Sequence, residues 1–486
     1  MTNSNLPAKK TKIVCTIGPA SQSREILEKM IVSGMNVARL NFAHGDFDSH
    51  LVTIKNIRAA SIGVGRRVAI MGDLPGPKIR VGRLADDPVY LIRGQSFILL
   101  IEEILGDSKR ASINFNNLPQ VVKPGDKIFI NDGFIQLEVE KVVGIQVHCQ
   151  VLVGDELRSF NGVNLPGIDL GIHAFTDRDR EFLEFSSEQR LDAVSQSFIQ
   201  CPEDIEEVRE AARAMDYNPF IVAKIERSRA VENLETILDV TDGIMVARGD
   251  LGVETPIEEI AITQKRIITQ ANLCGKPVIT ATHMLESMVH HTRPTRAEAT
   301  DVANAILDGT DCVMLSGETA MGSFPVEAVD VMTRIAQVTE PYSENLDVAK
   351  ILEEAKSSGE ISTEDLISLT IFFSTEALNP AAVITPTLSG STPRRISRFR
   401  PPVWIVAVSP NLSTCQDLQF SYGVFPMHET ERPVCWEKYT RDWINVHGLE
   451  GNLALLTQGT ALGKEGGTNK LEVIDLSKPS SEVSFW

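Results

Sequence analysis

Eight short runs rich in valine and isoleucine recur along the chain, and they constrain its fold more than any other feature. Stretches with the apolar spacing of amphipathic helices, such as 23–34 and 256–275, lie between them. Alternating strands and helices predict a parallel sheet, and eight such strands predict a closed (β/α)₈ TIM barrel. The runs are 12–18, 36–42, 68–74, 192–198, 219–226, 243–250, 277–284 and 312–318.

Two regions depart from this pattern. Residues 83–161 combine alternating apolar residues with turn signals, which predicts a small all-β domain inserted at the barrel mouth as a lid. After about residue 345, a helical stretch and several β-like runs predict a C-terminal α/β domain. The expected division is 1–82 and 162–345 for the barrel, 83–161 for the inserted lid domain, and 346–486 for the C-terminal regulatory domain.

The composition is acidic, with a net charge of −18. A nucleic-acid partner is therefore not expected, although a local basic cluster could still bind an anionic small substrate. The N-terminus lacks an apolar signal core and no long apolar stretch occurs, so we expect a cytoplasmic protein without membrane contact. The seven cysteines form no CxxC pair and are expected to be reduced thiols rather than a disulfide frame or a zinc site.

Polar or charged residues end most of the eight runs. In a barrel, the carboxyl ends of the strands face the active site, so these side chains are expected to meet at one mouth. A single polar residue can simply mark the end of a strand, but this explanation is weak for most of the eight together. The residues are Arg39, Asn41, Asp73, Ser197, Lys224, Glu226, Asp250, Thr282 and Glu318.

The stretches 223–228 and 247–254 hold the densest cluster of these charges. Glu226 and Asp250 end adjacent strands, so their carboxylates can hold one Mg²⁺, which keeps waters and takes substrate oxygens. Lys224 shares a strand face with Glu226, and an ammonium beside a metal stabilises a phosphoryl group in transit. Taken alone, the same residues also fit a surface Lys–Glu pair and a capping aspartate.

A second candidate site is the loop TLSGSTPRR (387–395). Its N–H groups and hydroxyls can form a phosphate-binding nest, flanked by Arg394 and Arg395. A loop that caps a helix starting near Pro393 is a rival interpretation. The candidate effector-binding residues are Thr387, Ser389, Gly390, Ser391 and Thr392.

Several long motifs resemble pyruvate kinase over about residues 12–476, the inserted domain included. They are AKIERSRAVENL, DGIMVARGDLGVE, KPVITATHMLESM, RPTRAEATDVANAILDGTDCVMLSGETA, NVARLNFAHG and GVNLPG. The resemblance implies phosphoryl transfer from phosphoenolpyruvate to ADP, then protonation of the enolate to pyruvate. It also implies a requirement for Mg²⁺ with Mn²⁺ as a substitute, a homotetramer, and an effector-binding role for the 387–392 loop.

The resemblance also assigns roles to individual residues. Lys224 would stabilise the transferring phosphoryl group, Arg39 would contact the phosphate, and Thr282 would lie near the carbon that gains a proton. Glu226 and Asp250 would hold Mg²⁺. The backbone at Gly249 and Asp250 would bind the substrate. The residues expected to face the nucleotide are Asn41, His44 and Arg80.

Three departures from the common family pattern concern a monovalent cation. Many members bind K⁺ through Asn, Ser, Asp and Thr, and carry Glu near this site. Here Asn41 and Asp73 are kept, but Ala43, Leu74 and Lys78 replace the Ser, Thr and Glu. A lysine ammonium is a compact monovalent cation, so Lys78 is expected to take the place of K⁺ beside Asp73. The enzyme is therefore expected not to require K⁺.

Other readings stay open on the sequence. Asn161 stands where a Lys often assists the nucleotide, and Pro75 where Lys or Gln is frequent. A Mg²⁺-dependent pyruvate-enolate aldolase or lyase could share Glu226 and Asp250, but it would not need a nucleotide. A non-catalytic ligand-binding relative is suggested by Ala43 and Leu74. The intact set of site residues argues against it: Arg39, Asp73, Lys224, Glu226, Asp250 and Thr282.

Overall fold

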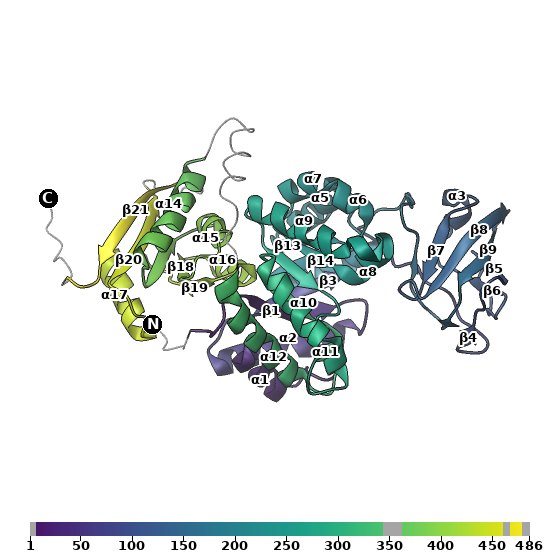
Figure 1. Cartoon of the computed structure of the whole chain (residues 1–486), viewed down its shortest axis with the longest axis horizontal. Coiled ribbons are helices and arrows are strands. Elements are labelled where there is room, and N and C mark those ends of the chain that lie inside the picture. The colour runs from purple at the N-terminus through teal and green to yellow at the C-terminus, as the bar shows by residue number, and fades with distance from the viewer. Residues whose placement is uncertain (1–5, 344–361, 460–466, 479–486) are drawn as a thin grey trace.

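The computed structural model describes residues 6–343, 362–459 and 467–478, and the predicted barrel lies at its centre. Eight parallel strands close in the order β1-β16-β15-β14-β13-β12-β3-β2, so the eight predicted runs all supply barrel strands. In Figure 1 the barrel lies between the C-terminal domain on the left and the inserted domain on the right. The strands are β1 (Lys12–Thr16), β2 (Val37–Asn41), β3 (Ala69–Leu74), β12 (Ala193–Gln196), β13 (Phe220–Ile225), β14 (Gly243–Ala247), β15 (Val278–Ala281) and β16 (Cys312–Leu315).

Helices surround the barrel and bury the outward-facing residues of its strands. Several begin at side-chain caps, including Ser23, Asp46, Thr176 and Thr295, whose oxygens accept N–H groups of the first turn. The helices are α1 (Arg24–Ser33), α2 (Phe47–Val64), α4 (Asp177–Glu188), α5 (Pro202–Ala214), α6 (Ser228–Glu232), α7 (Leu234–Val240), α8 (Arg248–Glu254), α9 (Ile260–Leu273), α10 (Arg296–Leu307), α11 (Gly317–Ala320) and α12 (Pro325–Thr339).

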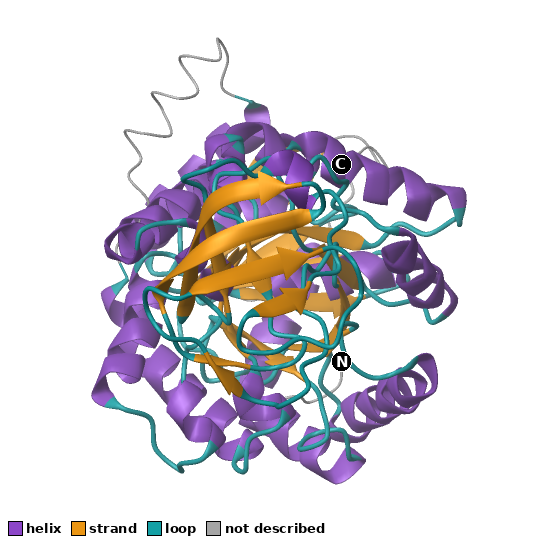
Figure 2. Ribbon diagram, turned by 90° about the vertical axis from the view of Figure 1, so that its right-hand side faces the viewer, coloured by secondary structure: helices purple, strands orange, loops and turns teal. Residues whose placement is uncertain are grey.

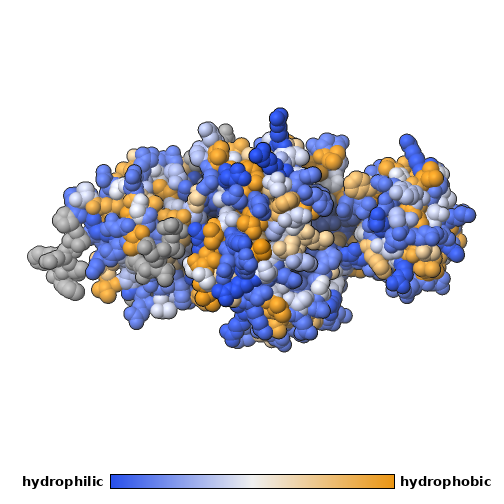
Figure 3. Space-filling model, turned by 90° about the horizontal axis from the view of Figure 1, so that it is seen from below, coloured by the Kyte–Doolittle hydropathy of each residue, from blue (hydrophilic) through white to orange (hydrophobic). Residues whose placement is uncertain are grey.

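The inserted unit is built almost entirely of strands, as predicted. Its six-stranded sheet has the order β11-β7-β8-β9-β5-β6, and β10 pairs with β4. Its hydrophobic core extends from Ile79 to Leu170, beyond the predicted limits 83–161. Figure 2 shows this sheet in front of the barrel end, and Figure 3 shows the unit as a separate lobe. The elements are β4 (Val89–Tyr90), β5 (Ser96–Leu100), β6 (Arg110–Ser112), α3 (Leu118–Val121), β7 (Lys127–Ile130), β8 (Ile135–Val143), β9 (Gln146–Val153), β10 (Glu156–Leu157) and β11 (Val163–Asn164).

The C-terminal part is an α/β domain with a five-stranded sheet of order β19-β18-β17-β20-β21. The predicted boundary at 345/346 lies outside the described residues. Within the described ranges, no helix has both the length and the apolar character needed to cross a membrane. The elements are α14 (Thr363–Leu378), β17 (Ala382–Pro386), α15 (Ser391–Ser397), β18 (Trp404–Ser409), α16 (Leu412–Asp417), β19 (Val424–His428), α17 (Trp436–His447), β20 (Leu453–Gly459) and β21 (Thr468–Asp475).

The C-terminal domain closes the amino-terminal end of the barrel. Phe420 belongs to the apolar cluster that fills the barrel interior, and its ring stacks on Phe220 with centroids 5.1 Å apart. This end is therefore packed with apolar side chains. The charged residues expected at the carboxyl ends of the strands lie at the opposite end, which faces the inserted unit.

Candidate active site

The inward-facing residues of the barrel strands change from apolar to charged along each strand. On β13, Phe220 and Val222 belong to the interior apolar cluster, and Lys224 follows in the same alternation. On β3, Met71 is followed in the same way by Asp73. Charged side chains thus form the last interior layer at the carboxyl ends of the strands, as the sequence predicted.

Lys224 lies at the centre of this charged layer. Its Nζ is 2.8 Å from Oε1 of Glu226 and 3.4 Å from Oδ1 of Asp73, and it donates a hydrogen bond to Ser197 Oγ at 2.7 Å. Burial alone would lower the pKa of Lys224, but Asp73 and Glu226 raise it to about 12. Lys224 is therefore a buried cation at neutral pH, held in place by three partners.

Asp73 orients the cations of the same layer. Its Oδ2 pairs with Arg39, and its Oδ1 accepts a hydrogen bond from Ser195 Oγ at 2.6 Å. Arg39 also donates to Thr16 Oγ1 at 2.9 Å. Burial would raise the pKa of Asp73, but Arg39 and Lys224 hold that pKa well below its usual range. Asp73 therefore stays ionised.

Two carboxylates of this layer could hold a divalent metal. Burial raises the pKa of Glu226, Lys224 opposes this rise, and the nearby charge of Asp250 adds to it. Oε2 of Glu226 accepts the N–H of Phe198 at 2.8 Å, which fixes the carboxylate. Across the described part of the chain, no group of three or more His, Cys, Asp or Glu residues could hold a metal. Two carboxylates fit Mg²⁺, which takes its other ligands from water and substrate.

A left-handed turn lies beside these carboxylates. Thr282 has φ 72°, which is unfavourable for a β-branched residue, and its carbonyl accepts a hydrogen bond from Arg248 at 2.7 Å. Arg248 also bonds the carbonyl of Ala281 at 3.1 Å and pairs with Asp301 at 2.7 Å. A Cβ on Gly249 would lie 3.0 Å from the Thr282 side chain, so Gly249 lets the two segments approach. Helix α8 begins at Arg248, directly after β14.

A pocket of about 310 Å³ separates the barrel mouth from the inserted sheet. Arg80 crosses it and donates to the carbonyl of Phe160 at 2.8 Å. The pocket contains residues from both parts of the molecule, which suits a ligand held between them. Its lining includes Lys78, Arg80, Asn131, Phe160, Asn161 and Asp250.

Two residues predicted to face the nucleotide, Asn41 and His44, are not among the lining residues of this pocket. The Asn41 side chain accepts the N–H of Ala43 at 3.1 Å and so fixes the turn after β2. The pKa of His44 is lowered by burial and then by the charges of Lys78 and Arg80. His44 therefore lies in the electrostatic field of the pocket cations.

Comparisons with known proteins agree with this geometry. Residues 8–329 match the family "pyruvate kinase, barrel domain", and residues 364–474 match "pyruvate kinase, alpha/beta domain". The chain belongs to the pyruvate kinase family. It is 45% identical to a pyruvate kinase of Thermococcus litoralis over 474 residues, covering 97% of this chain and 99% of that one.

Other pyruvate kinases are similar over nearly the whole chain. One from Geobacillus stearothermophilus is 42% identical over 476 residues, covering 96% of this chain and 80% of that protein. A crystal structure of a pyruvate kinase from Cryptosporidium parvum superposes with a TM-score of 0.88 at 35% identity, covering 96% of each chain. The sequence resemblance and the predicted fold are therefore confirmed, and the chain is a phosphotransferase.

Lys78 does not form the direct contact with Asp73 that the sequence suggested. Among the described residues, the ion pairs of Asp73 are with Arg39 and Lys224. Lys78 lies in the turn after β3; the residue is exposed to solvent overall, but it lines the pocket below the inserted unit, which partly desolvates its ammonium. Its pKa is lowered by burial and by Lys224, and raised by Asp73 and the metal-binding carboxylates. It therefore lines the pocket within the electrostatic reach of the charged layer.

Two of the four side chains that the resemblance assigns to K⁺ binding are replaced in this chain. Leu74 is fully buried among the outer barrel residues, so it offers no oxygen to the site. Ala43 has no side-chain oxygen either. Asn41 and Asp73, the remaining candidate ligands, already have partners within the protein.

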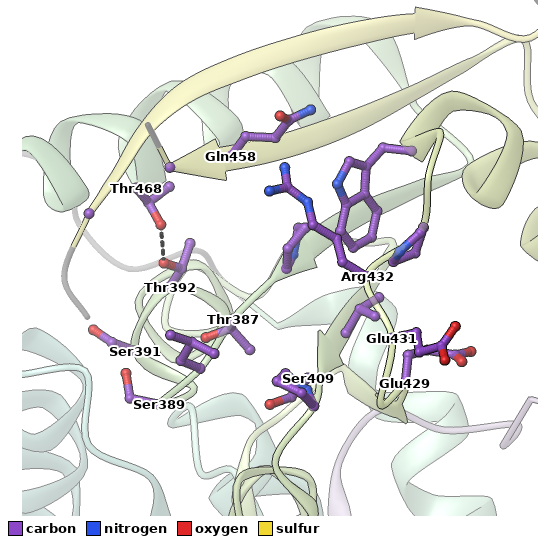
Figure 4. Close-up of a pocket in the computed structure, with 18 of the residues that line it drawn as sticks. Thr387, Ser389, Ser391, Thr392, Ser409, Glu429, Glu431, Arg432, Gln458 and Thr468 are labelled. Atoms are coloured by element: carbon purple, nitrogen blue, oxygen red, sulfur yellow. Dashed lines mark hydrogen bonds between the residues drawn. The ribbon is translucent and has the colours of Figure 1, made fainter. Parts of the chain in front are cut away.

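The predicted effector loop lines a second pocket of about 320 Å³ in the C-terminal domain (Figure 4). Thr387, Ser389, Ser391 and Thr392 face it, whereas Gly390 (φ 80°) forms the turn and donates its N–H to Thr387 Oγ1 at 2.9 Å. Helix α15 begins at Ser391, so the loop also starts a helix, as the rival interpretation held. The sequence reasoning missed further lining residues on other segments, namely Ser409, Glu429, Arg432, Trp436 and Gln458.

The two arginines expected to flank this pocket point elsewhere. Arg394 donates to the backbone carbonyl of Ser389 at 3.1 Å and lies over the Phe220 ring, 5.3 Å from its centroid. Arg395 pairs with Asp365 at 2.5 Å. Neither arginine is therefore among the residues that line the pocket. Figure 4 shows that Arg432 is the cation whose side chain enters the pocket.

Proposed function

We propose that this pyruvate kinase transfers the phosphoryl group of phosphoenolpyruvate to ADP in the cleft between the charged barrel layer and the inserted unit. The observation that carries the proposal is the position of Lys224, a buried cation between Asp73 and Glu226. A terminal phosphate oxygen of ADP attacks phosphorus, and the bond from phosphorus to the enol oxygen of phosphoenolpyruvate breaks. The charge spread over the phosphoryl oxygens during this step is stabilised by Lys224 and Arg39.

Glu226 and Asp250 would hold Mg²⁺, with Mn²⁺ as a substitute. When bound, the ion neutralises charge on the substrate oxygens. Gly249 gives the substrate close approach to the backbone of α8. Asp73 keeps Arg39 and Lys224 oriented, because both cations contact its carboxylate.

The enolate left by transfer must gain a proton to become pyruvate. Thr282 lies beside Gly249, and Arg248 holds its backbone. We assign Thr282 to the end of the substrate where the enolate carbon gains its proton. ADP would occupy the pocket that contains Lys78, Arg80 and Asn161, with His44 nearby. The inserted unit would then act as a lid that excludes water.

K⁺ is not needed in this proposal. Ala43 and Leu74 supply no side-chain oxygen for K⁺, and the ammonium of Lys78 lies in the field of Asp73, Asp250 and Glu226. Lys78 thus supplies monovalent positive charge from the pocket mouth.

The pocket beside Ser391 would bind a phosphorylated effector and so regulate the enzyme. Hydroxyls from the 387–392 loop and the cation of Arg432 line it, a donor set that suits phosphate oxygens. Exposed apolar side chains on α14 and β21, Leu366, Phe373 and Val473, support a homo-oligomer, for which a tetramer is the family expectation. Sedimentation velocity on the purified chain tests the subunit number.

An assay of pyruvate and ATP formation tests the reaction. Both products should form in equal amounts, and only when phosphoenolpyruvate, ADP and Mg²⁺ are all present. Pyruvate release without ADP would instead indicate the lyase alternative. Binding of phosphoenolpyruvate without turnover would indicate a non-catalytic relative.

A further inference from the structure

A buried ion pair lies directly behind the two carboxylates assigned to the metal. Arg227 follows Glu226 in the chain, and Glu254 is one helical turn beyond Asp250, at the end of α8. The Nη2 atom of Arg227 is 3.7 Å from Oε1 of Glu254, and the two side chains are only 6% and 3% exposed. One ion pair thus connects the segments that carry both metal-binding residues.

The same guanidinium also forms hydrogen bonds with the segment that leaves the inserted unit. Nη2 of Arg227 donates to the backbone carbonyls of Leu165 and Ile168, each at 3.2 Å. Leu165 belongs to the hydrophobic core of the inserted unit, and Ile168 packs against that core. These residues lie just after β11, where the chain returns from the inserted sheet to the barrel. Arg227 therefore joins the return segment to the barrel wall.

Glu254 completes this connection from the other side. Burial raises the pKa of Glu254, whereas Arg227 and the backbone N–H groups of Gly167 and Ser228 stabilise its charged form. Its carboxylate thus lies near the return segment and the start of α6, with Oε1 against Arg227 and Oε2 buried without a hydrogen-bond partner among the described residues. Three segments meet at one buried ion pair: the end of β13, the helix α8 and the exit from the inserted unit.

We propose that Arg227 and Glu254 are positioning residues that set the spacing of Glu226 and Asp250 and, at the same time, the place of the inserted unit above them. The pair reaches neither substrate, so it acts through the residues next to it. Metal binding and nucleotide binding then both depend on how this ion pair holds β13, α8 and the return segment together. This role rests on the assignment of Glu226 and Asp250 to Mg²⁺, which the magnesium titration of Glu226→Gln tests separately.

Arg227→Met and Glu254→Gln are the test variants, and Arg229→Met is the matched control. Arg229 lies on the same short helix and pairs with Asp169 of the same return segment at 2.7 Å, but both side chains are more than half exposed. Each variant is assayed as the full chain for its half-saturating Mg²⁺ and ADP concentrations and for kcat. Hydrogen exchange of residues 162–172 reports on the return segment directly.

We expect Arg227→Met and Glu254→Gln each to raise both half-saturating concentrations about tenfold, with a smaller fall in kcat and faster exchange over 162–172. Arg227→Lys should recover part of the loss. The double variant, Arg227→Met with Glu254→Gln, should be no worse than the poorer single variant, because both substitutions break the same ion pair. Arg229→Met should match the wild type. Lower thermal stability with unchanged Mg²⁺ and ADP half-saturation would overturn the proposal. If Arg227→Met does not fold, the same criterion applies to Arg227→Lys and Glu254→Gln.

Discussion

The Nζ atom of Lys224 lies 2.8 Å from Oε1 of Glu226, two residues further along the chain. The two side chains share one strand face and the same buried layer, so the ammonium and a metal carboxylate form a single unit. Any phosphate placed on the metal side of Glu226 would therefore meet a fixed cation. The next two predictions test the ammonium of Lys224 and the carboxylate of Glu226 separately.

Replacing Lys224 with Met should remove most turnover and leave the fold intact. Its charge is needed mainly while the phosphoryl group lies between two oxygens, so we expect kcat to fall by about a thousandfold or more. The control is Lys265→Met, because Lys265 is exposed and pairs with Asp308 away from the site. Stopped-flow and steady-state rates measure the effect, and circular dichroism checks the fold. A kcat within tenfold of the wild type would contradict the assignment.

Glu226→Gln should instead raise the Mg²⁺ concentration needed for half-maximal rate. The substitution keeps the size of the side chain but removes one of the two charges available to the ion. Titration of the rate with Mg²⁺ at saturating substrates measures this effect, with the exposed Glu258→Gln variant as control. Superimposable titration curves for Glu226→Gln and the wild type would argue that the metal binds elsewhere.

Much of the fold follows from the sequence, because its signals are local. Strand–helix alternation predicted all eight barrel strands, and the alternation of side chains within a strand places Lys224 and Asp73 inside the barrel. Strand β19 was not among the β-like runs expected in the C-terminal domain, because Pro426 interrupts its apolar residues. It lies at the sheet edge, where a residue without an N–H is tolerated.

The parts of the sites that depend on distant segments could not be predicted. Arg432 reaches the effector pocket from a loop that no motif marks, whereas Arg394 is adjacent to the motif and points to Phe220 instead. Ser195 was missed as a partner of Asp73, although its alternation with Ser197 placed both on the inward face. Each case depends on side-chain direction after folding, which spacing along the chain does not fix.

The effector pocket should respond to phosphorylated small molecules. A panel of sugar phosphates and nucleoside monophosphates should contain a compound that lowers the apparent KM for phosphoenolpyruvate. Ser391→Asp should abolish that response, because it places like charge where the phosphate would lie, and Arg432→Ala should weaken it. Arg395→Ala is the control, since that side chain pairs with Asp365 outside the pocket. A panel that changes nothing in the wild type would leave the loop with a structural role only.

The pH dependence of stability should show the effect of Asp417, at the end of α16. Burial raises its pKa to about 7; Arg394 opposes this rise, while Asp242 and Asp192 add to it. The folded state therefore binds the proton more tightly than the unfolded state. The stability that this proton contributes is fully present below about pH 4 and is lost as the pH rises through 7. The difference in Tm between Asp417→Asn and the wild type should therefore shift in favour of the variant as the pH rises from 5.5 to 8.5. A constant Tm difference across that range would contradict the raised pKa.

Lys78→Glu should weaken the enzyme by removing the ammonium from the pocket mouth and adding a carboxylate. Added K⁺ should recover part of the rate, because an external cation could then partly replace the lost charge. Rates at increasing KCl, with a bulky organic salt at equal ionic strength, measure the recovery. The exposed Lys29→Glu variant serves as a control for the change in net charge. A Lys78→Glu enzyme as active as the wild type without K⁺ would remove Lys78 from this role.

The most direct test of the account is the rate of pyruvate formation by the wild-type enzyme in K⁺-free buffer with a bulky organic counter-ion. Phosphoenolpyruvate, ADP and Mg²⁺ are held at saturation, and KCl is then added. The account predicts full ADP-dependent turnover before the addition and no significant increase after it. Strong activation by K⁺ would contradict it.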